Sequence, residues 1–332
     1  MRMTLNRGFR SILIKLVLLT TSTTVGLLLM EFVVREFLPF YRPATHLTFV
    51  VNSEHLIMGP PGVRMERKTP KGDFDFTVAF NGLGFRDVKD TTAGAITNIY
   101  VAGDSFSIGW GVEESERFSD VMQRQLGVPV YNISIPEDVR GYINTIKFAE
   151  RHGAKIRHLV VGLCMENDIW DYTLPVPTEE LYNQSQNKGG LRAVCNWFKG
   201  HSALWLFTSF QVQRFHFGRV LFEKLGVARN VEALTHKNDY SQKALTATRD
   251  ELLILTTNYN AVVLIIPSRG LWFGSNVAVE GRVHNELVGL LRDAGIRLVD
   301  MRPVFEKSGR PLQYYFETDP HWNAAGHRVA GE

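Results

Sequence analysis

Cysteine is nearly absent from this sequence, and its scarcity removes several classes of protein. Only Cys164 and Cys195 occur among 332 residues, which excludes a scaffold built on several disulfides and a zinc site made of four thiolates. A single disulfide between the two stays open, although buried free cysteine is the commoner state in apolar sequence. A hydrophobic core must therefore hold the fold, and 45% hydrophobic residues provide it. The length allows one substantial α/β domain with an appendage.

An excess of charge of one sign is missing as well. The chain carries 37 lysines and arginines against 34 aspartates and glutamates, so its formal net charge is only +3. No basic run with interleaved aromatic residues occurs, and such a run is what a nucleic-acid-binding surface would need. We therefore expect no nucleic-acid partner.

Long hydrophobic runs are also lacking, except near the N-terminus. Residues 16–30 contain no charge, and the apolar character extends over residues 12–34 with only Lys15 and Glu31 interrupting it. A helix of that extended length, at ~1.5 Å per residue, covers the ~30 Å hydrocarbon core of a bilayer. The two interrupting side chains are able to snorkel to the headgroups. The sequence therefore predicts an N-terminal transmembrane helix.

The charges around this segment predict its orientation. The residues after it have mixed charge, whereas four basic residues precede it: Arg2, Arg7, Arg10 and Lys15. The positive-inside rule then places the N-terminus in the cytoplasm and the remaining chain outside, which is the periplasm in a Gram-negative bacterium. A cleaved signal peptide is the alternative, but no small-x-small cleavage site follows the apolar run. We expect residues 1–40 to be the cytoplasmic N-terminus and an uncleaved anchor.

The rest of the chain divides into a lead-in and an α/β domain. Residues 41–95 are rich in proline, glycine and turn residues, with one alternating run at 74–80 that predicts a hairpin or edge strand. Within residues 96–332, short apolar runs predict strands at 96–102, 128–133, 158–163, 261–266 and 296–299. Helical patterns lie between them at 117–126, 142–152, 241–259 and 277–294. This alternation predicts a parallel sheet of about five strands covered by helices on both faces.

One segment breaks the alternation. Residues 171–238 follow the third predicted strand and form a helical, aromatic-rich stretch. We interpret it as an insertion, either a cap over a functional site or extra helices that never touch a substrate.

Polar residues with catalytic potential follow three of the predicted strands. In parallel sheets, ligands bind beyond the carboxyl ends of the strands. The first strand ends in residues 103–109 (GDSFSIG), where a tight glycine turn presents Ser105 as a nucleophile whose own N–H faces the developing oxyanion. The third strand is followed by Asn167, whose amide would be a second oxyanion donor. Such pieces occur singly in ordinary turns as well.

A third feature lies near the C-terminus. Asp319 and His321 are separated by one proline, which stiffens the loop that carries them. A histidine accepts a serine proton near neutral pH, and a neighbouring carboxylate fixes its tautomer and stabilises the imidazolium. The chain ends at Glu332 soon afterwards, and we expect a complete domain to have another helical turn or two there.

In combination, these motifs resemble the SGNH (GDSL-like) hydrolase family. The serine turn, the Asn-Asp after the third strand and the late aspartate-histidine pair occur in the family's order, and residues 81–87 (NGLGFRD) and the anchor resemble its membrane-anchored members. The resemblance implies a flavodoxin-like three-layer α/β/α sandwich and no metal or organic cofactor. It also implies catalysis by Ser105, Asp319 and His321, with oxyanion donors at Ser105, Asn167 and the family's glycine, for which Gly141 is the candidate.

The chain departs from the family pattern at two points. Glu137 and Asp138 stand where the family's glycine is expected, although any main-chain N–H there would serve as a donor. One residue, not two, separates Asp319 from His321, and Asp-x-His followed by tryptophan is similar to the polysaccharide O-acetyltransferase branch that includes the alginate acetylation proteins. In those proteins, however, the pair precedes the serine along the chain.

The sequence therefore predicts a serine esterase or deacetylase that acts on an acyl ester, such as an acylated polysaccharide or another cell-envelope substrate. The alternative is a polysaccharide O-acetyltransferase with the same triad, with a membrane-bound acyl-donor protein as its partner. A second alternative is an inactive, membrane-anchored glycan-binding or assembly protein.

Overall fold

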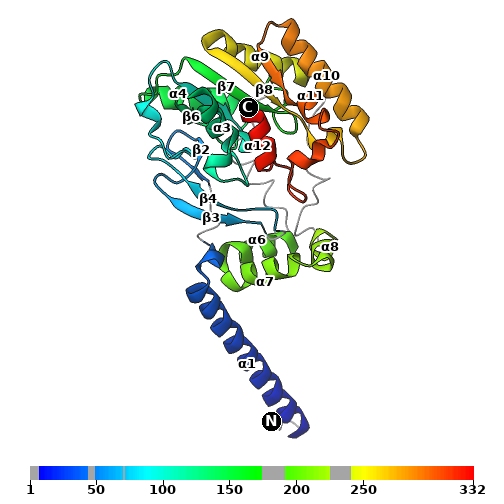
Figure 1. Cartoon of the computed structure of the whole chain (residues 1–332). Helices are drawn as coiled ribbons and strands as arrows, with labels where there is room; N and C mark the ends of the chain where they lie inside the picture. Colours follow the sequence, from blue (N-terminus) through cyan, green and yellow to red (C-terminus); the bar gives the residue numbers. More distant parts are fainter. Residues whose placement is uncertain (1–6, 44–48, 70–71, 174–190, 225–240) are drawn as a thin grey trace.

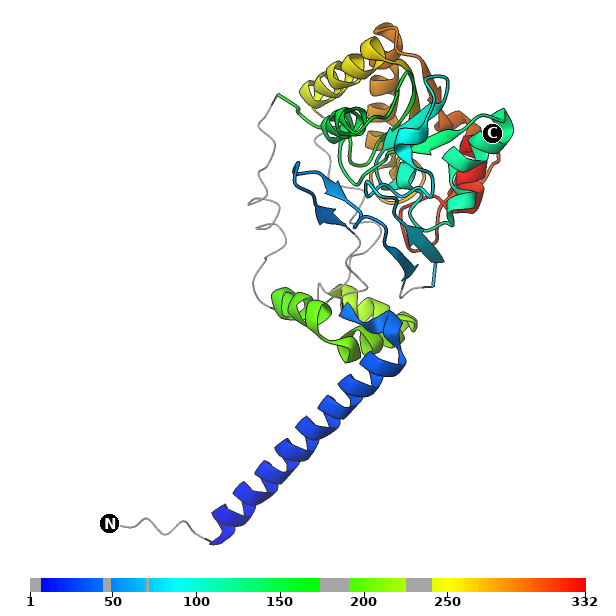
Figure 2. The ribbon, with the colours of Figure 1, turned by 90° about the vertical axis from the view of Figure 1, so that its left-hand side faces the viewer.

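A long helix and an α/β domain dominate the structure (Figure 1). The computed structural model of the chain describes residues 7–43, 49–69, 72–173, 191–224 and 241–332. Helix α1 (Arg7–Phe37) projects away from the rest in both views (Figures 1 and 2). The C-terminus lies within the α/β domain at the opposite end of the molecule.

The α/β domain is built on one five-stranded sheet in which every pairing is parallel. Its strands, in chain order, are β5 (Ile99–Gly103), β6 (Val130–Asn132), β7 (His158–Cys164), β8 (Asn260–Ile266) and β9 (Leu298–Asp300). They lie side by side in the order β6-β5-β7-β8-β9. This is the flavodoxin-like order: the chain runs from β5 to β6 at one edge, and then returns to the other side of β5, where β7, β8 and β9 follow. The predicted sheet is therefore confirmed.

The central strands consist of apolar, often β-branched residues because helices cover both faces of the sheet. In β7 and β8, Val161 and Val263 are partners in the register and both are fully buried. Helices α4, α9 and α10 pack on one face and helices α3, α11 and α12 on the other. The domain is thus the predicted three-layer α/β/α sandwich. Its helices are α2 (Ser105–Ile108), α3 (Phe118–Leu126), α4 (Val139–Arg151), α9 (Gln242–Asn258), α10 (Val277–Asp293), α11 (Met301–Glu306) and α12 (Ala324–Gly331).

The lead-in forms two small antiparallel pairs. Strands β1 (Val50–Val51) and β2 (Ile57–Met58) make one pair, and β3 (Arg64–Lys68) and β4 (Asp75–Ala79) make the other. The predicted strand at 74–80 is the second arm of this β3–β4 hairpin. Short 3-10 helices lie at η1 (Pro39–Tyr41), η3 (Thr91–Ala93), η4 (Glu114–Glu116), η6 (Arg269–Leu271) and η7 (Pro311–Tyr314).

The aromatic-rich segment after β7 forms three helices outside the α/β layers. They are α6 (Leu191–His201), α7 (Ala203–Gln213) and α8 (His216–Lys224), and Figure 1 shows them at the junction between α1 and the α/β domain. Helix α7 packs against α1 and η1. Residues 174–190 and 225–240 of the predicted insertion lie outside the described residues.

Both cysteines are buried free thiols. Cys164 ends strand β7, and Cys195 lies on α6. The disulfide that the sequence left open is therefore absent from this structure.

Candidate active site

Ser105 is the first residue of the short helix α2, directly after strand β5. Asp104 caps this helix, because its carboxylate accepts a hydrogen bond of 3.0 Å from the Phe106 N–H. A side chain at Gly103 would come within 2.2 Å of the Ser107 hydroxyl, so only glycine lets the helix approach the strand this closely. The serine is thereby presented at the carboxyl end of the sheet, where it is partly exposed.

A buried arginine fixes the other end of this turn. Arg86, only 2% exposed, donates hydrogen bonds to the carbonyl oxygens of Ile108 at 3.1 Å, Gly109 at 2.5 Å and Val112 at 2.7 Å. These carbonyls lie at and beyond the end of α2, where no helical N–H reaches them. The NGLGFRD motif of residues 81–87 therefore contains the side chain, Arg86, that holds the segment after Ser105 in place.

The loop between η7 and α12 carries the acid and the imidazole. Tyr315 and Trp322 form an antiparallel bridge across it, and the Phe316 N–H donates to the His321 carbonyl at 3.0 Å. At the exit, Asn323 caps helix α12 by accepting hydrogen bonds from two N–H groups of its first turn. Both ends of the loop are thus fixed, which limits the movement of His321.

The structure brings Ser105, His321 and Asp319 together in one chain of hydrogen bonds. The Ser105 Oγ lies 2.7 Å from His321 Nε2, although the two residues are 216 positions apart in sequence. On the other side of the ring, His321 Nδ1 lies 2.5 Å from Asp319 Oδ1, which also accepts the His321 N–H at 3.0 Å. The order of hydroxyl, imidazole and carboxylate is that of a serine nucleophile with its general base.

The electrostatics of the pair favour a positively charged imidazole beside a carboxylate. Burial lowers the pKa of His321, but the charge and hydrogen bond of Asp319, together with the charges of Asp104 and Glu166, outweigh burial, and the pKa lies above its ordinary value. Burial likewise raises the pKa of Asp319, yet the imidazolium and its hydrogen bonds bring it below the usual range. The His321 side chain is 17% exposed, so a substrate has access to the ring. Phe106 backs the ring at 4.8 Å between centroids.

Asn167 lies beside the serine turn, with part of its amide already engaged. Its Nδ2 donates to Asp104 Oδ2 at 3.0 Å, and the residue is otherwise exposed. The amide nitrogen carries two hydrogens, so one is left for another acceptor. Burial raises the pKa of Asp104, although the Asn167 hydrogen bond opposes that shift.

Gly141 does not have the free N–H that its predicted role requires. It lies in the first turn of α4, where its N–H donates to the capping carboxylate of Asp138 at 3.0 Å. The Glu137 N–H also has an acceptor, the Ile135 carbonyl at 2.8 Å. The physical reason is local. Gly141 lies in the first turn of a helix, and a capping side chain accepts hydrogen bonds from the N–H groups of that turn.

Two further residues, Arg269 and Glu166, shape this site and were not predicted from the sequence. Arg269, 6% exposed and placed after β8, donates to the carbonyl oxygens of Phe316 at 2.7 Å, Glu317 at 3.0 Å and Asp319 at 3.1 Å. Glu166 accepts the Arg269 N–H at 2.8 Å, and burial raises the pKa of Glu166 to about 7. Their position in the sequence was a usable signal, since both residues follow strand ends, as Ser105 and Asn167 do.

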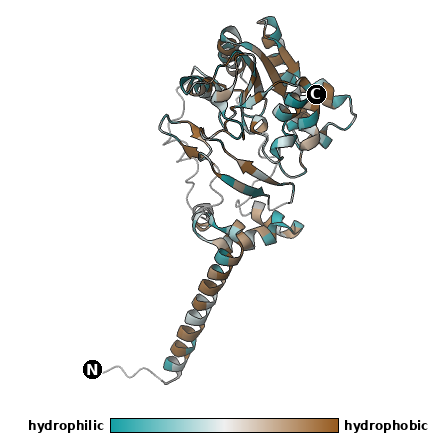
Figure 3. Cartoon of the chain, turned by 60° about the vertical axis from the view of Figure 1, so that its left-hand side comes forward, coloured by the Kyte–Doolittle hydropathy of each residue, from teal (hydrophilic) through white to brown (hydrophobic). Residues whose placement is uncertain are grey.

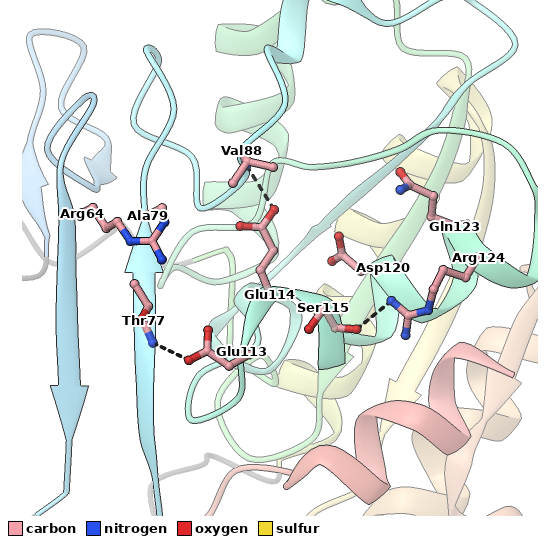
Figure 4. Close-up of a pocket in the computed structure, with 10 residues that line it drawn as sticks. All are labelled: Arg64, Thr77, Ala79, Val88, Glu113, Glu114, Ser115, Asp120, Gln123 and Arg124. Carbon is pink, nitrogen blue, oxygen red and sulfur yellow. Dashed lines mark hydrogen bonds between the residues drawn. The ribbon is translucent and has the colours of Figure 1, made fainter.

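A hollow of about 490 Å³ lies apart from these residues, between the β3–β4 hairpin and helix α3 (Figure 4). Its lining contains none of Ser105, Asp319 and His321. Two of its acids bind main chain: Glu113 accepts the Thr77 N–H at 3.0 Å, and Glu114 accepts the Val88 N–H at 3.1 Å. We interpret these contacts as the ones that hold the lead-in on the α/β domain.

Within the described ranges, no group of three or more histidine, cysteine, aspartate and glutamate side chains is arranged to hold a metal ion. What the arrangement supplies is a hydroxyl, a base in contact with it, and amide donors nearby. These groups suit nucleophilic attack on a carbonyl carbon.

Comparison with known proteins gives structural matches alone. No protein-family model matches the sequence, and no curated protein matches it either. The structure is similar to that of a lipolytic protein of the G-D-S-L family from Veillonella parvula, with 11% identity, a TM-score of 0.42, and coverage of 70% of this chain and 93% of that one.

Two further solved structures are similar at the same level. One is a carbohydrate esterase family 2 enzyme with a carbohydrate-binding domain from Corynascus thermopiles (Myceliophthora fergusii), with 12% identity, a TM-score of 0.37, and coverage of 73% of this chain and 65% of that one. The other is a lipase from a goat rumen metagenome, with 12% identity, a TM-score of 0.36, and coverage of 70% and 93%.

Proposed function

We propose that this protein is a serine esterase that removes acyl groups from an acylated polysaccharide or another cell-envelope ester. The observation that carries the proposal is the contact of 2.7 Å between Ser105 Oγ and His321 Nε2, with Asp319 on the far side of the ring. Two arginines support it. Arg269 holds the loop that carries Asp319 and His321, and Arg86 holds the segment after Ser105, and both do so through main-chain carbonyl oxygens.

The proposed reaction has two steps. Ser105 Oγ attacks the ester carbonyl while His321 accepts its proton, and His321 then returns that proton to the departing alcohol. Asp319 holds the ring and balances the imidazolium charge. The Ser105 N–H and the second N–H of the Asn167 amide stabilise the oxyanion, each such donor contributing about 3 kcal/mol. Water, activated by the same histidine, releases the acid.

The proposed location is outside the cytoplasm, with α1 as a membrane anchor. Helix α1 has a stretch of 28 residues, Arg10–Phe37, that is long and apolar enough to span a bilayer at ~42 Å, and none of its most apolar window is buried within the protein. Figure 3 shows the hydrophobic colour along nearly the whole helix. Arg10 and Lys15 at its start support a cytoplasmic N-terminus. An envelope substrate follows from that location.

The activity is tested by following the acyl group. Incubated with p-nitrophenyl acetate and oligosaccharides, the protein should release free acetate, and a fluorophosphonate probe should label Ser105 in a peptide map. An O-acetyltransferase, which has the same triad, would instead place acetyl groups on the sugar, visible as added mass. A protein that neither reacts with the probe nor turns over the ester would be a binding module.

The pH profile should follow the ionisation of His321. The base must be neutral to accept the serine proton. Burial lowers the pKa of His321, but Asp319, Asp104 and Glu166 together raise it above the ordinary 6.5. The rate of ester hydrolysis should therefore fall as the pH drops, with its half-maximal point above pH 6.5. Initial rates measured between pH 5 and pH 9 check this. A rate that stays constant down to pH 5 would contradict the assignment of His321 as base.

A further inference from the structure

The end of the anchor helix is joined directly to helix α7. Glu31 caps α7: its carboxylate accepts hydrogen bonds from the Ser202 hydroxyl at 2.8 Å and from the N–H groups of Ala203 and Leu204, both at 2.9 Å. Glu31 is also the first charged residue after the uncharged stretch of residues 16–30. Helix α7 therefore begins at the level where the apolar part of α1 ends, which is the bilayer interface if α1 spans a membrane.

Aromatic packing makes this joint rigid. Tyr41 in η1 makes edge-to-face contacts with Phe207 at 5.2 Å and Phe210 at 5.6 Å between ring centroids. On α7 itself, Ala203 and Leu206 are fully buried. Because α6 and α8 pack on α7, all three helices are held at the end of the anchor.

The unit formed by these three helices and their connections exposes large apolar side chains. Trp197 is 57% exposed, Phe215 71% and Phe217 78%. Val194, Phe198, Val212 and Leu221 are exposed as well, at 38% to 52%. Single exposed apolar residues are normal on soluble proteins, whereas a concentration of them on one small unit marks an interaction surface.

The charge of this unit is almost entirely positive. Residues 191–224 contain five lysines and arginines, two histidines and a single glutamate, while the whole chain is nearly balanced. Tryptophan and phenylalanine combined with lysine and arginine are the composition of helices that lie in the headgroup region of a membrane. A positive surface is also attracted by the negative lipids of a bilayer.

We infer that α6, α7 and α8 form an interfacial platform that rests on the bilayer surface beside the end of α1. The exposed aromatic side chains enter the boundary between headgroups and acyl chains, and the basic side chains contact lipid phosphates. The inference rests on the proposed membrane anchorage, and it is independent of the proposed chemistry. A lipid surface is the occupant because the joint at Glu31 fixes the platform at the height of the interface.

The platform also has a structural connection to the candidate active site. Lys68 of the β3–β4 hairpin lies over the Phe40 ring at 5.6 Å, and Phe40 in turn contacts Phe210 of α7. In the connection between β3 and β4, Asp73 accepts the Thr318 N–H at 3.1 Å, next to Asp319. The hairpin thus links the loop that carries the catalytic pair to the platform, and the site is held on the membrane-proximal side.

The test uses the full chain in lipid nanodiscs of phosphatidylcholine and phosphatidylglycerol. An environment-sensitive fluorophore is attached to Phe217→Cys or, separately, to Trp197→Cys, and nitroxide-labelled lipids serve as quenchers. Emission from both positions should shift to the blue and fall about two-fold or more on adding the quencher, as expected for groups buried ~5–10 Å into the interface. The parent chain is the labelling blank, since Cys164 and Cys195 are buried.

Two matched positions separate the outcomes. Ile254→Cys, an exposed apolar site on α9 at the far end of the domain in Figure 1, should show no quenching. Leu28→Cys on α1 should be quenched if the anchor spans the bilayer. Quenching at 28 without quenching at 197 and 217 would overturn the platform alone, and no quenching at 28 would overturn the anchorage. A blue shift at 217 without lipid quenching would mean burial against a second copy or another protein, which also overturns the inference.

Discussion

Replacing Ser105 with alanine is expected to lower the rate of acetyl ester hydrolysis by about 10³-fold or more. The variant keeps the fold, because the serine hydroxyl is partly exposed and its contact is with His321. It removes the only atom that attacks the carbonyl in the proposed mechanism, and what remains is catalysis by the oxyanion donors and by binding. Initial rates with p-nitrophenyl acetate measure the loss, and fluorophosphonate labelling should disappear with it.

Ser107→Ala is the matched control for this variant. Ser107 lies two positions along the same helix, and its buried hydroxyl has no hydrogen-bond partner among the described residues. Removing it should leave labelling and turnover close to those of the parent. If Ser105→Ala hydrolysed the ester as fast as Ser107→Ala, the nucleophile would be another group.

Asp319→Asn is expected to lower the turnover rate by ~10³- to 10⁴-fold, with little change in the overall fold. An amide of the same shape donates to His321 Nδ1 through its nitrogen, which favours the tautomer that carries its proton on Nε2 and leaves no lone pair for the serine proton. It also removes the carboxylate that raises the pKa of His321. The remaining activity should therefore show its acid limb at lower pH than the parent does.

Glu317→Gln removes a negative charge from the same loop without touching the ring. The Glu317 side chain is exposed, and only its main-chain carbonyl serves the structure, by accepting from Arg269. Its turnover should stay near the parent value, while circular dichroism confirms that both variants are folded. An Asp319→Asn rate within about tenfold of the Glu317→Gln rate would assign the orientation of His321 to a different group.

Two buried arginines position the reacting groups and take no part in the proposed proton transfer. Arg86 and Arg269 bind carbonyl oxygens of the two segments that carry the reacting groups, and neither arginine donates to Ser105 Oγ or to the His321 ring. Their role is to hold the geometry within the narrow range that proton transfer needs.

Much of the fold was predictable from the sequence, because the signals involved are local. Runs of apolar β-branched residues mark buried strands such as β7 and β8, and their alternation with amphipathic helices implies a parallel sheet. The uncharged residues 16–30 mark a helical stretch that lacks a protein cover, and none of the most apolar window of α1 is buried in the structure. Ser105 and Asn167 stood out because residues that follow strand ends share one edge of a parallel sheet. Asp319 and His321 stood out by their residue types and their close spacing in sequence.

Only the tertiary structure decided which of those residues have free hydrogen-bonding groups and which partners hold them. Gly141 matched a motif by spacing, yet its N–H is used by the cap of α4. Nothing in the sequence indicated the partners of Arg269 and Glu31, because those partners lie about 50 and 170 positions away along the chain. Local periodicity records whether a side chain is buried, whereas its partners depend on how distant segments pack, and packing is a property of the whole chain.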